Sequence, residues 1–142
     1  MTYANESHRR RSLVLFGGYG CGKTTWARSL GNHIYFGSQW SGANAMSGLT
    51  SAEYAVFDDW KGGMAGLPGY KDWFGCQWHV SVKRLYHDPT MVEWGRPIIW
   101  LCNTDPRVMS RVDDGIDWAW MDRACIFVEV VGQLATFRAN TR

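Results

Sequence analysis

Ser12-Leu-Val-Leu-Phe16 runs directly into Gly17-Gly-Tyr-Gly-Cys-Gly-Lys-Thr24, and this junction decides the fold. The apolar run is typical of a strand buried on both faces, and the glycines indicate a tight loop after it. The second stretch fits the phosphate-binding pattern G-x-x-x-x-G-K-[ST], and Lys23 to Leu30 is expected to form a helix that ends at Gly31. A strand, this loop and a helix, in that order, are the context in which the pattern predicts nucleotide binding.

The glycine loop supplies the chemistry of a phosphate site. Its glycines let successive backbone N–H groups converge on phosphate oxygens, while Lys23 is expected to bridge the terminal phosphates. Thr24 is expected to hold Mg²⁺ through its hydroxyl. A glycine-rich turn with a chance lysine is the alternative, and the flanking strand and helix disfavour it. The predicted ATP-binding residues are Gly17, Gly18, Tyr19, Gly20, Cys21, Gly22, Lys23, Thr24 and Thr25.

Polar side chains follow two further apolar runs. Asp58 and Asp59 come directly after Tyr54-Ala-Val-Phe57, and Asn103 follows Ile98-Ile-Trp-Leu-Cys102. We expect Asp58 to hold the Mg²⁺ shell and Asp59 to polarise the attacking water. Asn103 is expected to sense the γ-phosphate or to position water. The alternatives are a pair of aspartates that caps a helix and an asparagine that only forms a turn.

The rest of the chain alternates predicted strands with short helices. This alternation predicts an α/β fold with a mostly parallel sheet, whose ligands gather at the carboxyl ends of the strands. Residues 37–52 are rich in small and polar side chains and are expected to form a loop with at most a helical turn. The expected strands are 12–16, 33–36, 53–57, 97–102 and 125–131, the expected helices are 23–30, 70–75 and 117–123, and a hairpin is expected to join 79–86 to 91–94.

Composition limits the class of protein. A chain of 142 residues with 46% apolar residues fits one compact domain, and a formal net charge of +2 is too small to indicate nucleic-acid binding by itself. The four cysteines lack metal-ligand spacing, which favours a reducing compartment. No apolar run reaches the ~20 residues that span a bilayer, so we expect a soluble protein without a membrane partner. The expected division is a flexible basic segment at 1–11, an ATPase domain at 12–131 and a tail at 132–142.

Several segments besides the glycine loop carry a resemblance to a known family. Together with that P-loop, they resemble superfamily 3 helicases, in particular the ATPase half of replication-associated (Rep) proteins from circular single-stranded DNA viruses of the geminivirus and genomovirus kind. The likeness covers residues 11–130. Its carriers are Trp26-Ala-Arg-Ser-Leu-Gly31, Tyr54-Ala-Val-Phe-Asp-Asp59, Tyr70-Lys-Asp-Trp-Phe-Gly75, Trp94-Gly-Arg-Pro-Ile-Ile-Trp-Leu-Cys-Asn103 and Cys125-Ile-Phe-Val-Glu-Val130.

The resemblance implies a fold and an activity. The fold is an AAA+-like P-loop NTPase with a five-stranded sheet in the order 5-1-4-3-2, strands being numbered along the chain. A β-hairpin lies between the Walker B strand, which ends at Asp58, and the sensor strand, which ends at Asn103. The implied activity is that of a Mg-ATP-driven homo-oligomer, usually a hexameric ring. Such a ring translocates on single-stranded DNA and unwinds the duplex during rolling-circle replication in the host nucleus.

Family members place ATP between subunits, which implies a catalytic arginine from the neighbouring subunit. Such an arginine reaches the γ-phosphate and stabilises the charge of the transition state. Arg111 is the first choice because it follows Asn103 at short range, with Arg107 and Arg123 behind it. An exposed arginine in a polar loop with no role beyond solubility is the alternative.

The predicted hairpin corresponds to the family's DNA-tracking element. Candidate DNA contacts are Lys71, Lys83, Arg84 and His87, and ordinary solvated charges are the alternative at each position. The chain departs from its relatives here, because they tend to carry Asp-Lys before the tyrosine that matches Tyr86. This departure weakens the assignment of DNA contacts.

Two further expectations concern aromatic residues and DNA cleavage. Most of the nine tryptophans are expected in the core or at subunit interfaces, and Phe74 and Trp78 are the first aromatic residues to test for base stacking. The family's nicking domain has a His-hydrophobe-His metal site. No His-x-His occurs in this sequence, so DNA nicking is not expected of this chain.

Two other functions compete with the motor. A small P-loop kinase also combines a short chain with this loop, although such enzymes generally need an arginine-rich lid. An ATP-binding fragment that oligomerises or binds DNA without its own turnover is the second alternative. Hydrolysis, phosphate transfer to a metabolite, and binding without turnover distinguish the three.

Overall fold

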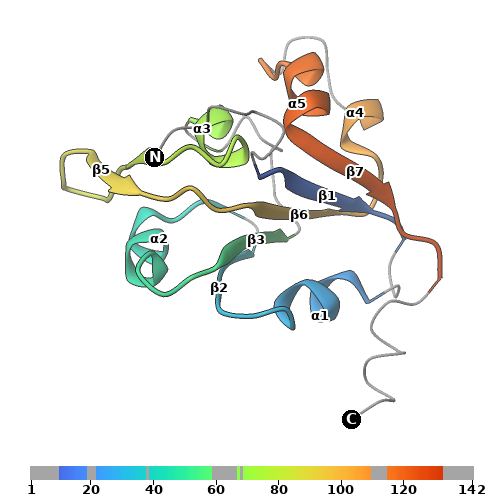
Figure 1. Cartoon of the computed structure of the whole chain (residues 1–142), viewed down its shortest axis with the longest axis horizontal. Coiled ribbons are helices and arrows are strands. Elements are labelled where there is room, and N and C mark those ends of the chain that lie inside the picture. The colour runs from blue at the N-terminus through green and yellow to red at the C-terminus, as the bar shows by residue number, and fades with distance from the viewer. Residues whose placement is uncertain are drawn as a thin grey trace.

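The computed structural model describes residues 10–18, 22–37, 39–58, 67, 69–109 and 115–132. Its centre is a five-stranded sheet in the order β2-β3-β6-β1-β7, and every pairing in it is parallel (Figure 1). The predicted α/β class with a mostly parallel sheet is therefore confirmed. The strands are β1 (Ser12–Phe16), β2 (His33–Gly37), β3 (Tyr54–Asp58), β6 (Ile98–Cys102) and β7 (Cys125–Glu129).

The register brings the carboxyl ends of the five strands to one edge of the sheet. Phe16 at the end of β1 is level with Cys102 of β6 and with Glu129 of β7. Asp58 at the end of β3 is level with Gly37 of β2 and lies one residue short of the end of β6. Loops that leave these strands therefore start beside one another, as ligand-binding loops of parallel sheets do.

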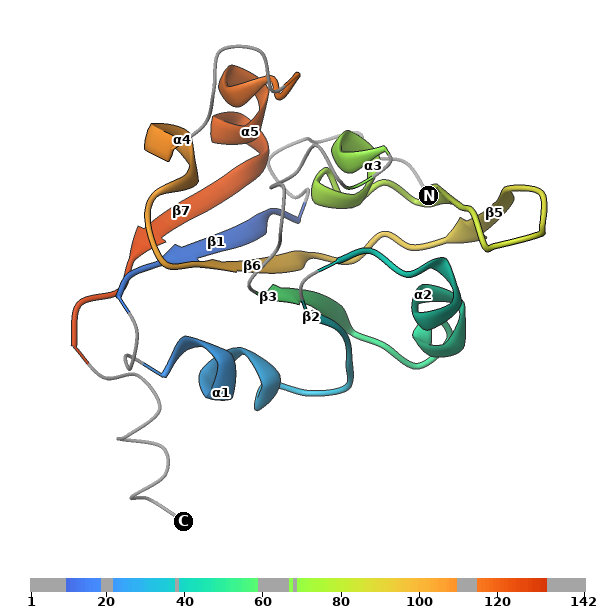
Figure 2. The same cartoon turned by 180° about the vertical axis from the view of Figure 1, so that it is seen from behind.

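Helices cover both faces of this sheet (Figures 1 and 2). Alternate strand residues point to opposite faces, so each buried strand contributes to two apolar clusters. One face packs against α1 and the other against α2, α3, α5 and the hairpin. The helices are α1 (Lys23–Arg28), α2 (Gly42–Gly48), α3 (Tyr70–Phe74), α4 (Pro106–Met109) and α5 (Trp118–Ala124).

Large aromatic side chains fill the second face. Trp73, Phe74 and Trp94 are almost fully buried there, with ring contacts from Trp73 to Trp94 and from Phe74 to Trp100. The expectation that tryptophans serve the core holds for these residues. Phe74, by contrast, is wrong as a candidate for base stacking, because its exposed fraction is 0%.

A buried hydroxyl joins three parts of this core. Ser12 is fully buried, and its Oγ donates to the Phe74 carbonyl at 2.9 Å and accepts from the Ile98 N–H at 3.0 Å. The start of β1 is thereby tied to the end of α3 and to the start of β6. The Ile98 N–H depends on this side chain, and the Phe74 carbonyl accepts in addition a long hydrogen bond from the Cys76 thiol, since buried polar groups need partners.

Helix α2 corrects the prediction of a loop over residues 37–52. The sequence there is rich in Gly, Ser, Ala and Asn, yet Ser41 caps the helix by accepting the Asn44 N–H at 3.1 Å. Ala45 and Leu49 are buried against the sheet, and this tertiary contact outweighs the weak helix propensity of the segment. A Cβ on Gly42 would overlap the Lys83 carbonyl, so the helix start fits closely against the hairpin.

Helix α1 is shorter than expected. It ends at Arg28, where Ser29 caps it and donates its Oγ to the Trp26 carbonyl at 2.7 Å. Leu30, the last residue of the predicted helix, lies beyond this end and is 47% exposed. The predicted helix is therefore two residues too long, about half a turn.

The predicted hairpin is present and stands outside the main sheet. It consists of β4 (His79–Val82) and β5 (Thr90–Glu93) in antiparallel pairing. Val80 and Val82 are fully buried in the second face's cluster. Within the described residues, no helix is long and apolar enough to cross a membrane.

Candidate functional site

The glycine loop leaves the sheet between β6 and β7. The Gly17 N–H donates to the Cys102 carbonyl at 3.2 Å, and the Val130 N–H donates to the Phe16 carbonyl at 2.7 Å. A Cβ on Gly17 would lie 2.6 Å from the Val130 carbonyl oxygen, so only glycine fits at this exit. Gly22 closes the described part of the loop with a left-handed backbone of φ 79, which also favours glycine.

Lys23 holds the loop together from within. It follows Gly22 at the start of α1, and its side chain is buried, with 8% of the residue exposed. Its Nζ donates to the Gly17 carbonyl at 2.8 Å and to the Gly18 carbonyl at 3.2 Å. A buried ammonium requires such partners. The positive charge is therefore placed among the backbone groups of the loop, where phosphate oxygens are expected to bind.

Thr24 and Asp58 meet across two elements. Thr24 lies in the first turn of α1 and Asp58 ends β3, and the Thr24 hydroxyl donates to Asp58 Oδ2 at 2.8 Å. These are the two residues that the sequence assigned to Mg²⁺, and the structure brings them together. Oxygen ligands and a single carboxylate suit Mg²⁺, which usually keeps waters and takes further oxygens from a phosphate. The described residues contain no cluster of three or more His, Cys, Asp or Glu side chains for a metal, so a metal ion here would depend on such added ligands.

Tyr35 is a residue of this site that the sequence reasoning missed. Its hydroxyl donates to the same Asp58 Oδ2 at 2.7 Å. Tyr35 of β2 is level with Val56 of β3, so it shares a face with Val56 and with Asp58 two residues further on. The Arg28 guanidinium lies 3.9 Å from the centroid of the Tyr35 ring. The alternation of β2 would have indicated the face of Tyr35, but only the pairing with β3 shows what it can reach.

Asn103 follows β6 directly and is exposed. Its neighbour Cys102 is level with Phe16, so Asn103 lies beside the start of the glycine loop. Burial raises the pKa of the Cys102 thiol to about 12, although the charge of Lys23 acts in the opposite direction. The hydrogen bond from the Gly17 N–H to the Cys102 carbonyl ties the end of β6 to the start of the loop.

Some predicted site residues lie outside the described residues. They are Tyr19, Gly20 and Cys21 of the loop, Asp59, and Arg111. Thr25 is exposed in the first turn of α1. The described part of the site is therefore the two ends of the loop, the start of α1 and the ends of β3 and β6.

Comparison with known proteins identifies relatives of this chain by sequence. The chain is 37% identical to the replication-associated protein of Bean yellow dwarf virus over 98 residues, which cover 68% of this chain and 28% of the relative. It is 38% identical over 95 residues to the corresponding protein of Tobacco yellow dwarf virus (strain Australia), covering 66% and 26% of the two chains. For Maize streak virus genotype E (isolate Pat) it is 34% identical over 115 residues, covering 79% and 30%.

The chain belongs to the replication-associated (Rep) protein family of circular single-stranded DNA viruses. It spans less than a third of the length of these three Rep relatives, as their covered shares of 28%, 26% and 30% show. No family model matches the sequence. The predicted resemblance to Rep proteins is thus confirmed, and the relatives are viral replication proteins.

Of the second-choice arginines in this Rep chain, Arg107 is occupied within its own subunit. Its guanidinium forms ion pairs with Asp105 at 2.8 Å and Asp122 at 3.0 Å, and it stacks 4.2 Å from the centroid of the Phe127 ring. The hydrogen bond from Arg107 lowers the pKa of the Asp105 carboxyl. Arg123 is exposed in the last turn of α5. Arg107 is therefore a poor donor to a neighbouring subunit.

The four candidate DNA contacts of the Rep chain do not form one group. Lys83, Arg84 and His87 lie in the connection between β4 and β5, where the Lys83 ammonium donates to the His87 carbonyl. Lys71 lies on α3, and its Nζ is 3.2 Å from Asp117 Oδ2 at the start of α5. The structure thus places three candidates in the hairpin connection, whereas Lys71 lies on α3 and is paired with Asp117.

Proposed function

We propose that this chain is the Mg-ATP-dependent ATPase motor of a viral replication initiator, of the superfamily 3 helicase type. In this proposal it translocates on single-stranded DNA and unwinds the duplex during rolling-circle replication in the host nucleus. The observation that carries the proposal is the meeting of Lys23, Thr24 and Asp58 at the carboxyl edge of the sheet. The relationship to viral Rep proteins supports the replication role.

The described residues have complementary tasks in ATP hydrolysis. Lys23 would exchange its bonds to the Gly17 and Gly18 carbonyls for bonds to phosphate oxygens, which bear more negative charge. Thr24 and Asp58 would hold Mg²⁺, with Asp58 kept in place by Tyr35. When bound, Mg²⁺ supplies positive charge that offsets the charge developing on the transferred phosphoryl group. Asn103, exposed beside the loop, would sense the γ-phosphate or orient the attacking water.

The strand order supports the AAA+-like type. In the order β2-β3-β6-β1-β7, the strand that precedes the loop lies between the strand ending before Asn103 and the last strand. The strand that ends at Asp58 is next to the Asn103 strand. The site therefore combines a carboxylate and an amide from neighbouring strands, and groups of these kinds can hold the metal ion and orient the attacking water in phosphoryl transfer.

A homo-oligomer, in the family's reading a hexameric ring, would complete this site. Arg111 of a neighbouring subunit remains the first choice for the catalytic arginine, and Arg123 is the second, because Arg107 is engaged by Asp105 and Asp122. The hairpin would carry the contacts to DNA through its basic connection. The neighbour's arginine would stabilise the negative charge that develops on the γ-phosphate. Within this chain's own described site residues, Lys23 is the side chain that supplies positive charge there.

The direct test is ATP hydrolysis by the full chain, with and without single-stranded DNA, measured alongside solution mass. Lys23→Ala is expected to abolish turnover. Lys71→Ala, which removes an ammonium paired with Asp117 on α3, is expected to keep its basal rate. Because Lys23 also supports the loop, the melting temperature of each variant accompanies the assay.

The other outcomes select the competing functions. Turnover in Lys23→Ala equal to that of the unchanged protein would contradict the motor. Transfer of phosphate to a nucleoside or a sugar rather than to water would indicate a small kinase. Tight ATP binding without hydrolysis, in the presence or absence of DNA, would indicate an ATP-binding fragment that assembles or binds DNA without turnover of its own.

A further inference from the structure

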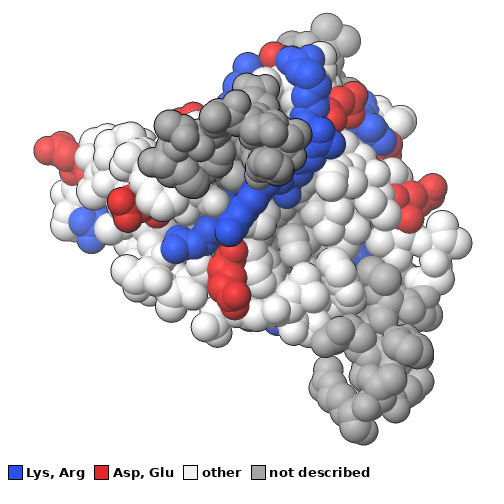
Figure 3. Space-filling model, viewed as in Figure 1, with Lys and Arg blue, Asp and Glu red and all other residues white. Residues whose placement is uncertain are grey.

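Positively charged side chains gather at the edge of the sheet opposite the glycine loop. Within two residues of the starts of β6, β1 and β7 the chain carries Arg96, Arg10 with Arg11, and Arg123. We call these four side chains the arginine row. Figure 3 shows a band of Lys and Arg side chains crossing the face of the molecule that is turned to the viewer in Figure 1.

The register of the sheet explains why the four arginines form a row. Ser12 is level with Cys125, and Leu13 is level with Ile99, so three neighbouring strands start at the same height. Neighbouring strands lie about 4.8 Å apart, which puts the three starts within about 10 Å of one another. That span is similar to the Debye length of ~10 Å at 0.1 M salt, so the four charges act on a ligand as one field.

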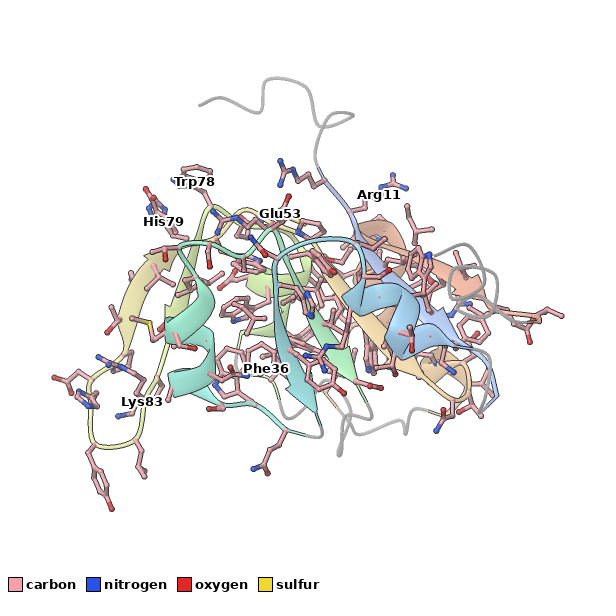
Figure 4. All side chains as sticks on the ribbon, turned by 90° about the horizontal axis from the view of Figure 1, so that it is seen from below. Arg11, Phe36, Glu53, Trp78, His79 and Lys83 are labelled. Carbon is pink, nitrogen blue, oxygen red and sulfur yellow. The ribbon has the colours of Figure 1, made fainter. Side chains whose placement is uncertain are left out.

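The row is not neutralised by ion pairs of its own. Among the described residues, the ion pairs involve Lys71 and Arg107 and none of the four row arginines. Arg10, Arg11 and Arg123 are exposed, and Arg96 is half-buried and anchored through its Nη1, which donates to the Leu49 carbonyl at 3.0 Å. With a formal net charge of only +2 for the chain, the four arginines are a local concentration of positive charge, opposed at this edge by Glu53, which directly precedes β3 and accepts from the Asn32 N–H (Figure 4).

An aromatic surface continues the row on the side of β6. Trp78 is 49% exposed. The Trp94 N–H donates to the Trp78 carbonyl, and the Gly95 N–H donates to the Gln77 carbonyl. A Cβ on Gly95 would lie 2.9 Å from the Trp78 ring, so the indole rests against this glycine, directly before Arg96. Figure 4 shows Trp78 and Arg11 on the same edge of the sheet, while Lys83 of the hairpin lies away from that edge.

We propose that the arginine row and Trp78 form a second binding surface, for single-stranded nucleic acid, at the amino edge of the sheet. Arginines neutralise the phosphate backbone, and an exposed indole offers a face on which a base can stack. A purely acidic protein segment would use the arginines but would have no need for the ring. The surface is distinct from both the nucleotide site and the hairpin, so it stands whether or not the chain hydrolyses ATP.

The salt dependence of binding tests the arginine row. Affinity of the full chain for a fluorescent oligo-dT is measured by anisotropy without nucleotide, over a range of salt concentrations. The slope of log K against log salt is negative, and each lost phosphate contact lowers its magnitude by about 0.7 for single strands. Arg10→Ala with Arg11→Ala is therefore expected to lower this magnitude by about 1.4. Lys83→Ala with Arg84→Ala removes the same charge from the hairpin and serves as the matched background.

The double substitution Arg10→Ala with Arg11→Ala is made both in the unchanged chain and in the chain that carries Lys83→Ala with Arg84→Ala. A fall of about 1.4 in both backgrounds supports the proposal. An unchanged slope in either background overturns it, since the row would then contribute nothing of its own. Because binding is measured without nucleotide, this test is separate from that of the ATPase.

Trp78→Ala tests the stacking surface, and a competitor tests the class of partner. Loss of a stacked base costs about 1–3 kcal/mol, so Trp78→Ala is expected to weaken binding by about 5- to 140-fold with no change in the salt slope. Poly-glutamate is expected to compete far less well than oligo-dT of equal charge. Equal competition, or binding unchanged in Trp78→Ala, would indicate a general polyanion or acidic-protein surface and overturn the proposal.

Discussion

Removing the Tyr35 hydroxyl tests whether the Asp58 carboxylate is oriented for a metal ion, on the basis of the proposed ATPase function. Asp58 Oδ2 accepts hydroxyl hydrogen bonds from Thr24 at 2.8 Å and from Tyr35 at 2.7 Å. If Thr24 turns its oxygen to Mg²⁺, the bond to the carboxylate is given up. Tyr35 then becomes the hydroxyl that keeps this oxygen in place.

The size of the effect follows from the environment of the carboxylate. A hydrogen bond to a charged group contributes about 1.5–3 kcal/mol, and the lower value applies because Asp58 is only half-buried. About 1.4 kcal/mol corresponds to a tenfold change in an equilibrium constant or a rate. Tyr35→Phe is therefore expected to lower kcat/KM for ATP by about tenfold at limiting Mg²⁺, and to lower it less when Mg²⁺ is saturating.

Tyr54→Phe is the matched control. Tyr54 lies on the neighbouring strand and in the same apolar cluster, but its hydroxyl donates to the Ala27 carbonyl rather than to Asp58. ATP hydrolysis is measured as a function of Mg²⁺ concentration for both variants, with urea unfolding to compare their stability. If both variants share one Mg²⁺ dependence, or if Tyr35→Phe matches the unchanged protein throughout, the reasoning about Asp58 is refuted.

Two further predictions concern stability and reactivity. Ser12→Ala leaves the buried Ile98 N–H without its partner and leaves the Phe74 carbonyl only the long contact from the Cys76 thiol. At about 1–3 kcal/mol for a buried unsatisfied group, it should lower the free energy of unfolding in urea by at least about 1 kcal/mol. Ser47→Ala, at an exposed serine, should change it by less than about 0.5 kcal/mol, and equal effects would contradict the role of Ser12. In a Cys21→Ala background, the half-buried Cys102 thiol, with its pKa raised to about 12, should react slowly with a thiol reagent at pH 8 and progressively faster as the pH rises, because the thiolate fraction increases. Labelling of the native protein at pH 8 as fast as that of the unfolded protein would contradict the raised pKa.

The parts of the site that lie close together in sequence could be predicted from the sequence. Lys23 and Thr24 follow from a motif of fixed spacing, because one loop and one helical turn position them. Asp58 could be found because it ends a buried strand, and parallel strands end at one edge. These assignments need no knowledge of which strands are neighbours.

What the sequence could not predict depends on pairing and tertiary contact. Tyr35 reaches Asp58 only because β2 pairs with β3 in one register, and a shift of one residue would turn its side chain to the other face. The arginine row likewise requires that β6, β1 and β7 start at one height. Helix α2 was missed because burial of Ala45 and Leu49 stabilises a segment whose own residues favour a loop.

The shortness of the strands has a consequence for communication across the molecule. Each strand of the main sheet has 5 residues, so at about 3.3 Å per residue its two ends are about 16 Å apart. That is longer than the ~8–10 Å over which charges in physiological salt act on one another. Through solvent, a change of charge at the glycine loop would therefore be largely screened before it reached the amino edge. A rigid-body shift of β1 and β6, the strands that join these two ends, is not subject to that screening.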